Sequence, residues 1–416
     1  MKILLVVLDG AGDRPVKTLA GMTPYEYADT PHLDFLASIG RVGLLHPVPG
    51  VAPESDIAVM SLLGYPPEKY TGRGPLEALG AGIRIREGEL ALRCNIASSK
   101  DGKKLLDRRA GRKISRKEAR EIESLLNKIK LPGFKLKFKM TAGHRGVLVI
   151  RRKDNKPLSD KITNTDPAYD KKGHYSVARS EYSMIVRKCK PLSKDAEPAA
   201  RAVNQFTEKA YRALSRARFN KEREKKGIFP ANTVLCRDAG NKIPNVLPLT
   251  KKYGKKFMII ADMPLEIGIA RLAGMKVKKL SPGESAEAYK KRAVLAKQAL
   301  KENDLVYVHL KGPDLYGHDS DCAGKAKSIE QIDKHFFGNL VTQTLLKKTI
   351  IAVTSDHSTP CKLGVHSADP VPLMIAGSIT VPGPARKFGE KACSLGKLGR
   401  MRGIELMPFL MGLNKI

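Results

Sequence analysis

A short apolar run near the carboxyl terminus constrains the fold more than any other feature of the sequence. Residues 350–354 read Ile-Ile-Ala-Val-Thr and are followed directly by Ser355, Asp356 and His357. A short, apolar, β-branched run of this kind predicts a strand that is buried on both faces, as in a parallel sheet. In open α/β sheets, side chains beyond the carboxyl ends of such strands form the binding sites. The pattern therefore predicts an α/β fold with a site beyond this strand.

Two other apolar runs end in a similar way. Residues 3–8 stop at Asp9, and residues 305–310 lead into Asp314 and His318. Taken alone, the first aspartate is read as part of a turn and the second pair as a polar loop. Because the carboxyl ends of parallel strands meet at one edge of a sheet, we expect all these groups to converge.

A serine at the start of a predicted helix belongs to the same set. Taken alone, Ser55 is read as a helix N-cap. The alternative is a nucleophile that a metal ion activates. Carboxylates and imidazoles in this number suit two divalent ions, one beside the serine hydroxyl and one on the oxygens of a transferred phosphoryl group. The expected ligands are Asp9, Ser55, Asp314, His318, Asp356, His357 and His366.

The middle of the chain has a different pattern, with short strands and alternating charged residues. The glycine-dense stretch 71–82 predicts a hinge or domain boundary. We expect an α+β domain at residues 83–237, inserted into an α/β domain that residues 1–82 and 238–416 form together. Expected elements of the insertion include a strand within residues 141–150 and one long amphipathic helix at residues 197–226.

Arginines in this middle region lie among Gly, Ala, Asn and His rather than in lysine runs. Arg93, Arg109, Arg112 and Arg145 are the examples. Such arginines either cover a solvated surface or bind a carboxylate and a phosphate through paired hydrogen bonds. Both interpretations remain open from the residues alone.

The formal net charge of the 416-residue chain is +33. A basic surface attracts nucleic acid, but no basic run coincides with a nucleic-acid-binding motif, so no specific nucleic-acid partner is expected. A solvated lysine-rich surface is the simpler interpretation, and it would also attract an anionic substrate.

The remaining composition favours a soluble cytoplasmic protein. The 6 cysteines include no CxxC pair, so we expect free thiols in a reducing compartment. The apolar run before Asp9 is too short for a signal peptide, and no segment has the length of a membrane span. The oligomeric state stays open.

Several longer segments are distributed along nearly the whole chain, among them LLVVLDGAGDRP, ESDIAVMSLLGYPP, GRGPLEALGAGI, TAGHRGVLV and HSADPVPLMIAG. By these segments the chain resembles the archaeal-type cofactor-independent phosphoglycerate mutases of the alkaline phosphatase superfamily. The resemblance implies an alkaline-phosphatase-like core, a phosphorylated serine at Ser55 and interconversion of 2-phosphoglycerate and 3-phosphoglycerate in glycolysis and gluconeogenesis. It also implies two divalent ions, manganese first and magnesium or another ion as alternatives, and no bisphosphoglycerate.

The resemblance also assigns residues to roles. It places one metal on Asp9, Ser55, Asp356 and His357, and the other on Asp314, His318 and His366. The inserted domain would close over a small phosphorylated substrate. Two positions depart from the family pattern, because Ile267 stands where a lysine is usual and Ala168 where a histidine is usual. The substrate-binding candidates are Arg93, Arg109, Arg112, His144, Arg145 and Asp166.

Overall fold

The computed structural model describes residues 1–179, 181–377 and 380–413. The chain forms two compact units. The first comprises Met1–Tyr70, Val246–Asp262 and Ile269–Ile416, and the second comprises Thr71–Asn245 and Met263–Gly268. Residues 83–237 fall within the second unit.

An eight-stranded sheet forms the centre of the first unit. Its first five strands pair in parallel, the next strand is antiparallel to both of its neighbours, and the last pair is parallel again. The predicted α/β class with a mostly parallel sheet is therefore confirmed. The order across the sheet is β11 (Lys276–Lys279), β10 (Phe257–Ala261), β12 (Leu305–Leu310), β1 (Lys2–Leu8), β13 (Thr349–Thr354), β14 (Val371–Ala376), β2 (Arg41–His46) and β15 (Gly399–Arg402).

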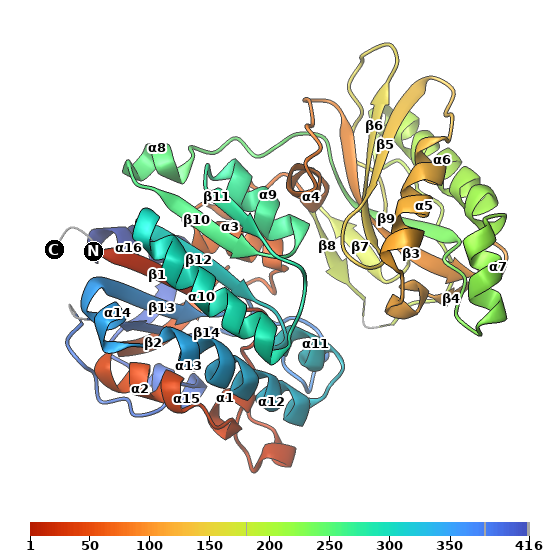
Figure 1. Ribbon diagram of the computed structural model, residues 1–416. Coiled ribbons are helices and arrows are strands. Elements are labelled where there is room, and N and C mark those ends of the chain that lie inside the picture. Colours follow the sequence, from red (N-terminus) through yellow and green to blue (C-terminus); the bar gives the residue numbers. More distant parts are fainter. Residues whose placement is uncertain (180, 378–379, 414–416) are drawn as a thin grey trace. The chain divides into compact units, whose positions relative to one another are not determined.

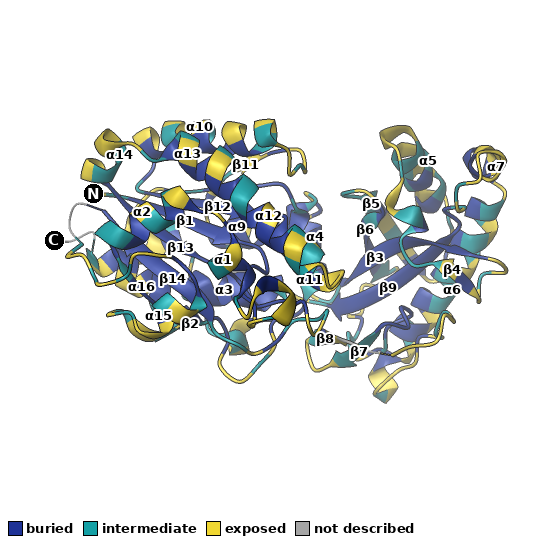
Figure 2. Ribbon diagram, turned by 90° about the horizontal axis from the view of Figure 1, so that it is seen from below, coloured by how far each residue is buried: buried dark blue, intermediate teal, exposed yellow. Residues whose placement is uncertain are grey.

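Helices cover both faces of this sheet. α10 (Ala286–Glu302) and α12 (Cys322–Ile332) lie on one face, and α3 (Ser55–Leu62) and α16 (Gly403–Leu413) lie on the other (Figures 1 and 2). β12 and β13 are buried along their whole lengths because their apolar side chains meet helices on both sides. The other α-helices of this unit include α1 (Pro24–Tyr27), α2 (Pro31–Ile39), α8 (Leu249–Tyr253), α11 (Pro313–His318), α13 (Gly338–Leu340), α14 (Gln343–Lys348) and α15 (Glu390–Ser394).

The second unit is built on an antiparallel five-stranded sheet. Apolar residues of α5 (Arg116–Asn127) and α6 (Glu197–Ser215) pack against this sheet in one core cluster. A separate two-stranded ribbon, β7 (Tyr169–Lys172) with β8 (Tyr175–Ala178), belongs to the same unit. The large sheet contains β4 (Leu105–Asp107), β3 (Leu90–Ser99), β6 (Arg145–Arg152), β5 (Phe134–Met140) and β9 (Thr233–Gly240).

The glycine-dense stretch 71–82, expected to be a hinge or domain boundary, contains the helix α4 (Arg73–Gly80), and the second unit begins at Thr71. One expectation about helices is wrong. The long helix expected at residues 197–226 is two helices, α6 and α7 (Arg218–Lys225). The break comes at Ala217, whose backbone is extended. The side-chain amide of Asn220 donates a hydrogen bond to the carbonyl of Leu214 at 2.8 Å, which gives a partner to one of the free carbonyls at the end of α6.

One further expectation is also corrected. The residues from Asp314 to His318, expected in a loop, form α11, which begins at a proline that suits the first helical position. The strand expected within residues 141–150 is present as β6, which runs from Arg145 to Arg152 after the turn that joins it to β5. Among the described residues, no helix combines the length and apolar composition needed to cross a membrane.

Candidate functional site

The three aspartates singled out in the sequence lie together at the carboxyl edge of the sheet in the first unit. β1 pairs in parallel with both β12 and β13, so neighbouring strands deliver Asp9, Asp314 and Asp356 to one place. Ligand atoms of Asp9 lie within 4.8 Å of those of Asp314 in one group, and within 4.8 Å of those of Asp356 in another.

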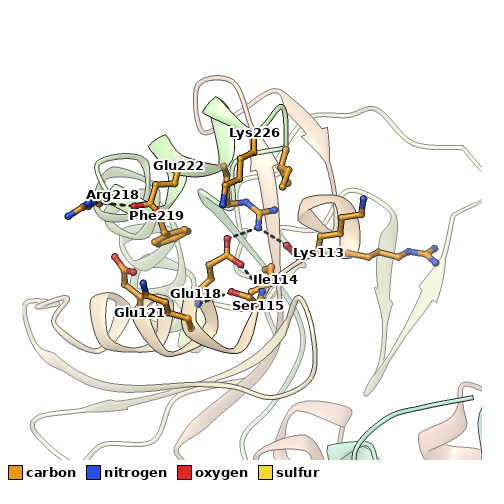
Figure 3. A pocket seen from close by; sticks show the side chains of 13 residues that line it. Lys113, Ile114, Ser115, Glu118, Glu121, Arg218, Phe219, Glu222 and Lys226 are labelled. Atoms are coloured by element: carbon orange, nitrogen blue, oxygen red, sulfur yellow. Dashed lines mark hydrogen bonds and ion pairs between the residues drawn. The ribbon is translucent and has the colours of Figure 1, made fainter. Parts of the chain in front are cut away.

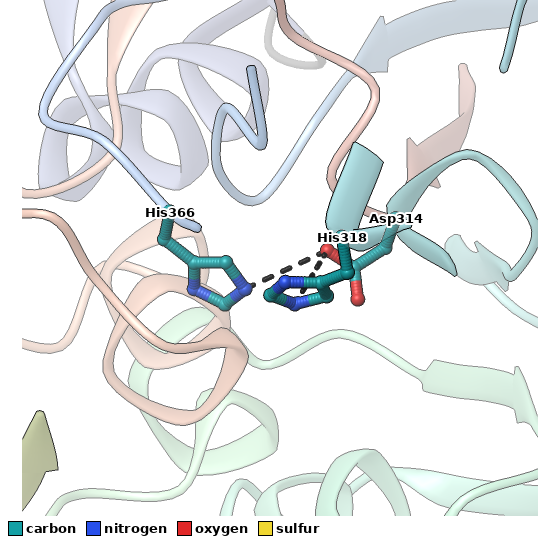
Figure 4. Close-up of side chains that lie close together, drawn as sticks. All are labelled: Asp314, His318 and His366. Atoms are coloured by element: carbon teal, nitrogen blue, oxygen red, sulfur yellow. Dashed lines mark ion pairs between the residues drawn. The ribbon is translucent and has the colours of Figure 1, made fainter. Parts of the chain in front are cut away.

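Asp314, His318 and His366 form one compact group of possible metal ligands (Figure 4). Asp314 Oδ1 lies 3.6 Å from His318 Nε2 and 3.5 Å from His366 Nε2. Nδ1 of His318 donates to the carbonyl of Gly364, and Nδ1 of His366 donates to that of Pro53, each at 2.9 Å. Because a carbonyl only accepts, Nδ1 carries the hydrogen in both rings, and Nε2 is directed toward the carboxylate.

A second group surrounds the ring of His357. Its Nε2 lies 3.4 Å from Asp9 Oδ1, 3.5 Å from Asp356 Oδ2 and 3.4 Å from Ser55 Oγ. Its Nδ1 lies 3.0 Å from the hydroxyl of Thr359. Ser55 is the first residue of α3, after the N-cap residue Glu54, so it lies at the helix end where backbone N–H groups have no acceptor within the helix.

Both groups combine a carboxylate with imidazoles, and the second group also contains unpartnered oxygens. In the described part of the chain, no group donates a hydrogen bond to the buried atoms Asp9 Oδ1 and Asp356 Oδ2 of this second group. Buried carboxylate oxygens of this kind are costly unless a positive charge lies beside them. Carboxylates combined with imidazoles suit divalent transition metals. The residues present therefore fit a cation in each group.

The charges of the site agree with this fit. Burial raises the pKa of Asp356, and the charge of Asp9 raises it further. In His366, burial lowers the pKa, but the carboxylates of Glu54 and Asp314 outweigh burial and raise it to about 10. A cation at the carboxylates would relieve their repulsion, and it would displace the His366 proton because imidazole binds metals in its neutral form.

Two neighbours of Asp9 were not predicted from the sequence. Lys311 Nζ lies 2.7 Å from Asp9 Oδ2, and His309 Nε2 lies 3.8 Å from Asp9 Oδ1 and 4.0 Å from Asp356 Oδ2. Although burial raises the pKa of Asp9, Lys311 and His309 hold it well below its usual value. The available signal was a histidine near the carboxyl end of an otherwise apolar strand.

In the second unit, buried and half-buried arginines gather around Glu77. Arg73 Nε lies 2.8 Å from Glu77 Oε1, and Arg93 Nε lies 3.4 Å from the same oxygen. Nε of Arg145 is buried and donates no hydrogen bond to any residue that the structure describes. Burial, together with the charges of Arg237 and Arg73, lowers the pKa of Arg93 to about 9. A second carboxylate, Asp238, lies 3.5 Å from Arg237 Nε. Among the described residues, the arginines of this cluster still outnumber Glu77 and Asp238, and this surplus of positive charge suits an anion.

The other predicted substrate-binding residues occupy varied places in the second unit. Burial and the charges of Arg145 and Arg109 lower the pKa of His144 to about 2, so its ring is neutral. Asp166 is fully buried and accepts both Nε and Nη2 of Arg108, at 2.9 and 2.8 Å. Arg112 lines a pocket of about 770 Å³ whose other lining residues include Ser115, Glu118, Phe219 and Arg223 (Figure 3).

The two positions that depart from the family pattern are both buried. Ile267 in α9 (Pro264–Leu272) is 1% exposed, and Ala168 is 4% exposed. Neither side chain can donate a hydrogen bond to a phosphate or carry a proton. These positions therefore supply no polar group to the chemistry.

Comparisons with known proteins place this geometry in a family. A sequence model of 2,3-bisphosphoglycerate-independent phosphoglycerate mutase matches residues 37–220. The curated enzyme of that name from Aeropyrum pernix is 45% identical, over 97% of each chain. That from Methanopyrus kandleri is 40% identical, over 99% of this chain and 96% of the relative.

Solved structures agree. A protein from Pyrococcus horikoshii shares 32% identity and a TM-score of 0.78, over 99% of this chain and 97% of that one. The cofactor-independent phosphoglycerate mutase of Thermoplasma acidophilum shares 32% identity and a TM-score of 0.62, over 99% of this chain and 100% of its own. With such identities along nearly its whole length, this chain belongs to the 2,3-bisphosphoglycerate-independent phosphoglycerate mutase family.

Proposed function

We propose that this protein interconverts 2-phosphoglycerate and 3-phosphoglycerate without bisphosphoglycerate, through a phosphorylated Ser55. The observation that carries the proposal is the position of the Ser55 hydroxyl, 3.4 Å from Nε2 of His357 within the carboxylate group. A hydroxyl is a weak nucleophile until a base or a cation activates it. The named relatives supply the substrate class.

We propose that two divalent ions occupy the two groups of side chains. When bound, they supply positive charge that lowers the pKa of a nearby hydroxyl and neutralises phosphate oxygens. Manganese is the first candidate, with magnesium or another divalent ion as the alternative. One ion is assigned to Asp9, Ser55, Asp356 and His357, and the other to Asp314, His318 and His366.

The residues of the chain have three tasks in this proposal. Ser55 takes the phosphoryl group and later returns it to the other hydroxyl of the glycerate, and the first N–H groups of α3 assist by facing the anion. Lys311 adds positive charge at Asp9. Residues 83–237 act as a substrate-binding domain that excludes water, since water would otherwise take the phosphoryl group. The proposed substrate contacts are Arg93, Arg109, Arg112, His144, Arg145 and Asp166.

A second candidate function is a phosphatase, or a phosphotransferase acting on another small phosphorylated metabolite. It would use the same serine and the same ions. The observation that favours it is the apolar character of Ile267 and Ala168, which leaves two family positions without a cation or an imidazole. Weaker retention of the glycerate would let water complete the reaction.

A coupled assay separates the two candidates. 3-Phosphoglycerate is supplied with manganese and enolase, without bisphosphoglycerate, while phosphoenolpyruvate and free phosphate are recorded in parallel. The mutase predicts phosphoenolpyruvate at a rate far above that of phosphate release, and loss of both signals in a chelator until manganese is restored. Phosphate release without phosphoenolpyruvate would overturn the mutase assignment and favour the phosphatase.

A further inference from the structure

A buried lysine lies behind the metal-ligand groups of the first unit. Lys325 belongs to α12, and its side chain is 0% exposed. Its ammonium lies 2.8 Å from the carboxylate of Asp13, which is also buried. Burying such a pair is costly, and replacing it by apolar residues is often neutral or stabilising. Stability alone therefore gives a weak account of its presence.

The ammonium joins two loops that carry ligands. Its three hydrogens match three acceptors, namely the carbonyl of Gly12 at 2.9 Å, Asp13 Oδ2 at 2.8 Å and the carbonyl of Thr359 at 2.9 Å. Gly12 and Asp13 follow Asp9 at the end of β1, whereas Thr359 follows His357 after β13. One cation thus fixes the separation of these two loops.

Thr359 extends the connection to both groups of ligands. Its hydroxyl donates to Asp314 Oδ1 at 2.7 Å and lies 3.0 Å from His357 Nδ1. Because the hydroxyl hydrogen is used by Asp314, the imidazole Nδ1–H is the donor to the hydroxyl oxygen, and Nε2 remains available as a ligand. Lys325 therefore holds the backbone of Thr359. The side chain of Thr359 in turn orients Asp314 in one group and His357 in the other.

The second partner of the ammonium is anchored as well. Asp13 accepts the backbone N–H of Cys361, at 3.2 Å for Oδ1 and 3.1 Å for Oδ2. The N–H of Thr359 donates to the carbonyl of Gly12 at 3.0 Å, beside the contact from Lys325. The two loops therefore share a small hydrogen-bonded network with the ammonium at its centre.

We propose that Lys325 is a positioning residue that sets the spacing between the two metal-binding groups without touching a metal ion itself. The inference rests on the proposed function, because it takes the two groups to hold divalent ions. An ammonium suits this task since it carries hydrogens in three directions and cannot act as a ligand while protonated. Lys325 acts through Thr359 and Asp13 on ligands after β1, β12 and β13.

The test is manganese binding to the full chain, measured by calorimetry and by the electron paramagnetic resonance of coupled manganese pairs. Lys325→Met keeps the length of the side chain and removes its hydrogens. We expect about 10–100-fold weaker manganese binding and loss of the coupled-pair signal, while circular dichroism stays unchanged. Because Lys325→Met leaves Asp13 buried without a counter-charge, the double variant Lys325→Met with Asp13→Asn is measured too, and the same loss of affinity is expected.

A matched control is Lys171 in the second unit, which also donates to backbone carbonyls, those of Asp160 and Ala239. Lys171→Met should leave manganese affinity at the wild-type value. A folded Lys325→Met or double variant with wild-type affinity and a normal coupled-pair signal would overturn the proposal and leave a structural role only. Failure of the wild-type protein itself to bind manganese or another divalent ion would instead overturn the proposed function, so the two failures differ.

Discussion

Ser55 is the residue on which the proposed phosphoryl transfer depends, and it can be removed with little disturbance. Ser55→Ala should lower kcat by roughly 10³-fold or more, because no other hydroxyl takes the phosphoryl group. The unfolding midpoint should change little. The measurement is the coupled assay, together with acid quenching after labelled substrate, which should trap a phosphoserine in the wild type only.

Ser61 offers a matched control in the same helix. It is fully buried in α3, and its hydroxyl has no hydrogen-bond partner within residues 1–179, 181–377 and 380–413. Ser61→Ala should therefore retain wild-type turnover and the phosphoserine label. Turnover near the wild-type rate in Ser55→Ala would remove the serine from its assigned role.

Glu390 should make stability depend on pH. It is the first residue of α15 and is half-buried, and it accepts the backbone N–H of Asp13 at 3.0 Å and the hydroxyl of Thr23 at 2.6 Å. Burial raises its pKa to about 7, against about 4.3 in an unfolded chain. The folded state thus keeps a proton that the unfolded state has lost. The contribution of Glu390 to the free energy of unfolding is therefore complete below about pH 4.3, and it is lost as the pH rises through about 7.

Glu390→Gln should remove this dependence, since glutamine stays neutral. Between about pH 5 and pH 8, the free energy of unfolding of the wild type should fall relative to that of the variant by up to about 3 kcal/mol. Denaturant titrations at each pH, with a chelator present throughout, provide the measurement. Two pH profiles that run parallel would contradict the assignment.

At the scale of single residues, the sequence indicated carboxylates that follow apolar strands and missed residues whose partners become apparent only in the folded chain. Asp9 and Asp356 stand where a run of apolar residues stops, which marks them as exceptional. His309 and Lys311 acquire their neighbours only through the pairing of β1 with β12. Thr359 resembles any other polar loop residue until its contacts to two ligands are known.

Among the elements, the contact between α4 and α9 shows how glycine is used in this fold. A Cβ on Gly268 would lie 1.9 Å from the carbonyl oxygen of Leu76, and one on Gly80 would lie 1.7 Å from that of Pro264. The two helix backbones therefore touch directly. Glycine is needed here for close approach and not for a turn.

Gly268→Ala should force these helices apart. We expect a loss of about 1–3 kcal/mol in the free energy of unfolding, because the added methyl group meets backbone and cannot be accommodated by a rotamer change. Thermal unfolding followed by circular dichroism provides the measurement. Gly283→Ala is the control, since a Cβ there would lie 3.4 Å from that of Ala288, an ordinary contact. Equal midpoints for the two variants would refute the close contact.

The same contact explains which elements could be predicted from the sequence. Apolar β-branched runs specify strands locally, and β1, β12 and β13 were found at nearly their observed bounds. The glycines of α4 were interpreted as a hinge or domain boundary, and the helix itself was missed, because its partner helix α9 lies far away in the sequence. α11 was missed for a related reason, since a single helical turn after a proline has too few residues to show a helical period.

On the scale of the whole molecule, the outstanding quantity is the net charge of +33. Charge of one sign raises the local concentration of oppositely charged solutes and speeds their association. The proposed substrate carries a phosphate and a carboxylate, so it would be attracted over distances set by the salt concentration. A nucleic acid would be attracted as well, which keeps a nucleic-acid-binding role as the alternative from another class.

Added salt should therefore weaken substrate binding more than it slows the chemical step. The screening length is about 30 Å at 0.01 M and about 8 Å at 0.15 M ionic strength, so potassium chloride added across this range should remove most of the long-range attraction. We expect KM for 3-phosphoglycerate to rise roughly 3- to 10-fold while kcat changes little, because groups that contact the bound substrate are screened far less. Initial rates at saturating manganese, with the coupling enzymes in excess at every salt concentration, provide the measurement. An unchanged KM would mean that the surface charge does not act on the substrate. If DNA binding then depended steeply on salt concentration and persisted in a chelator, the nucleic-acid-binding role would be favoured.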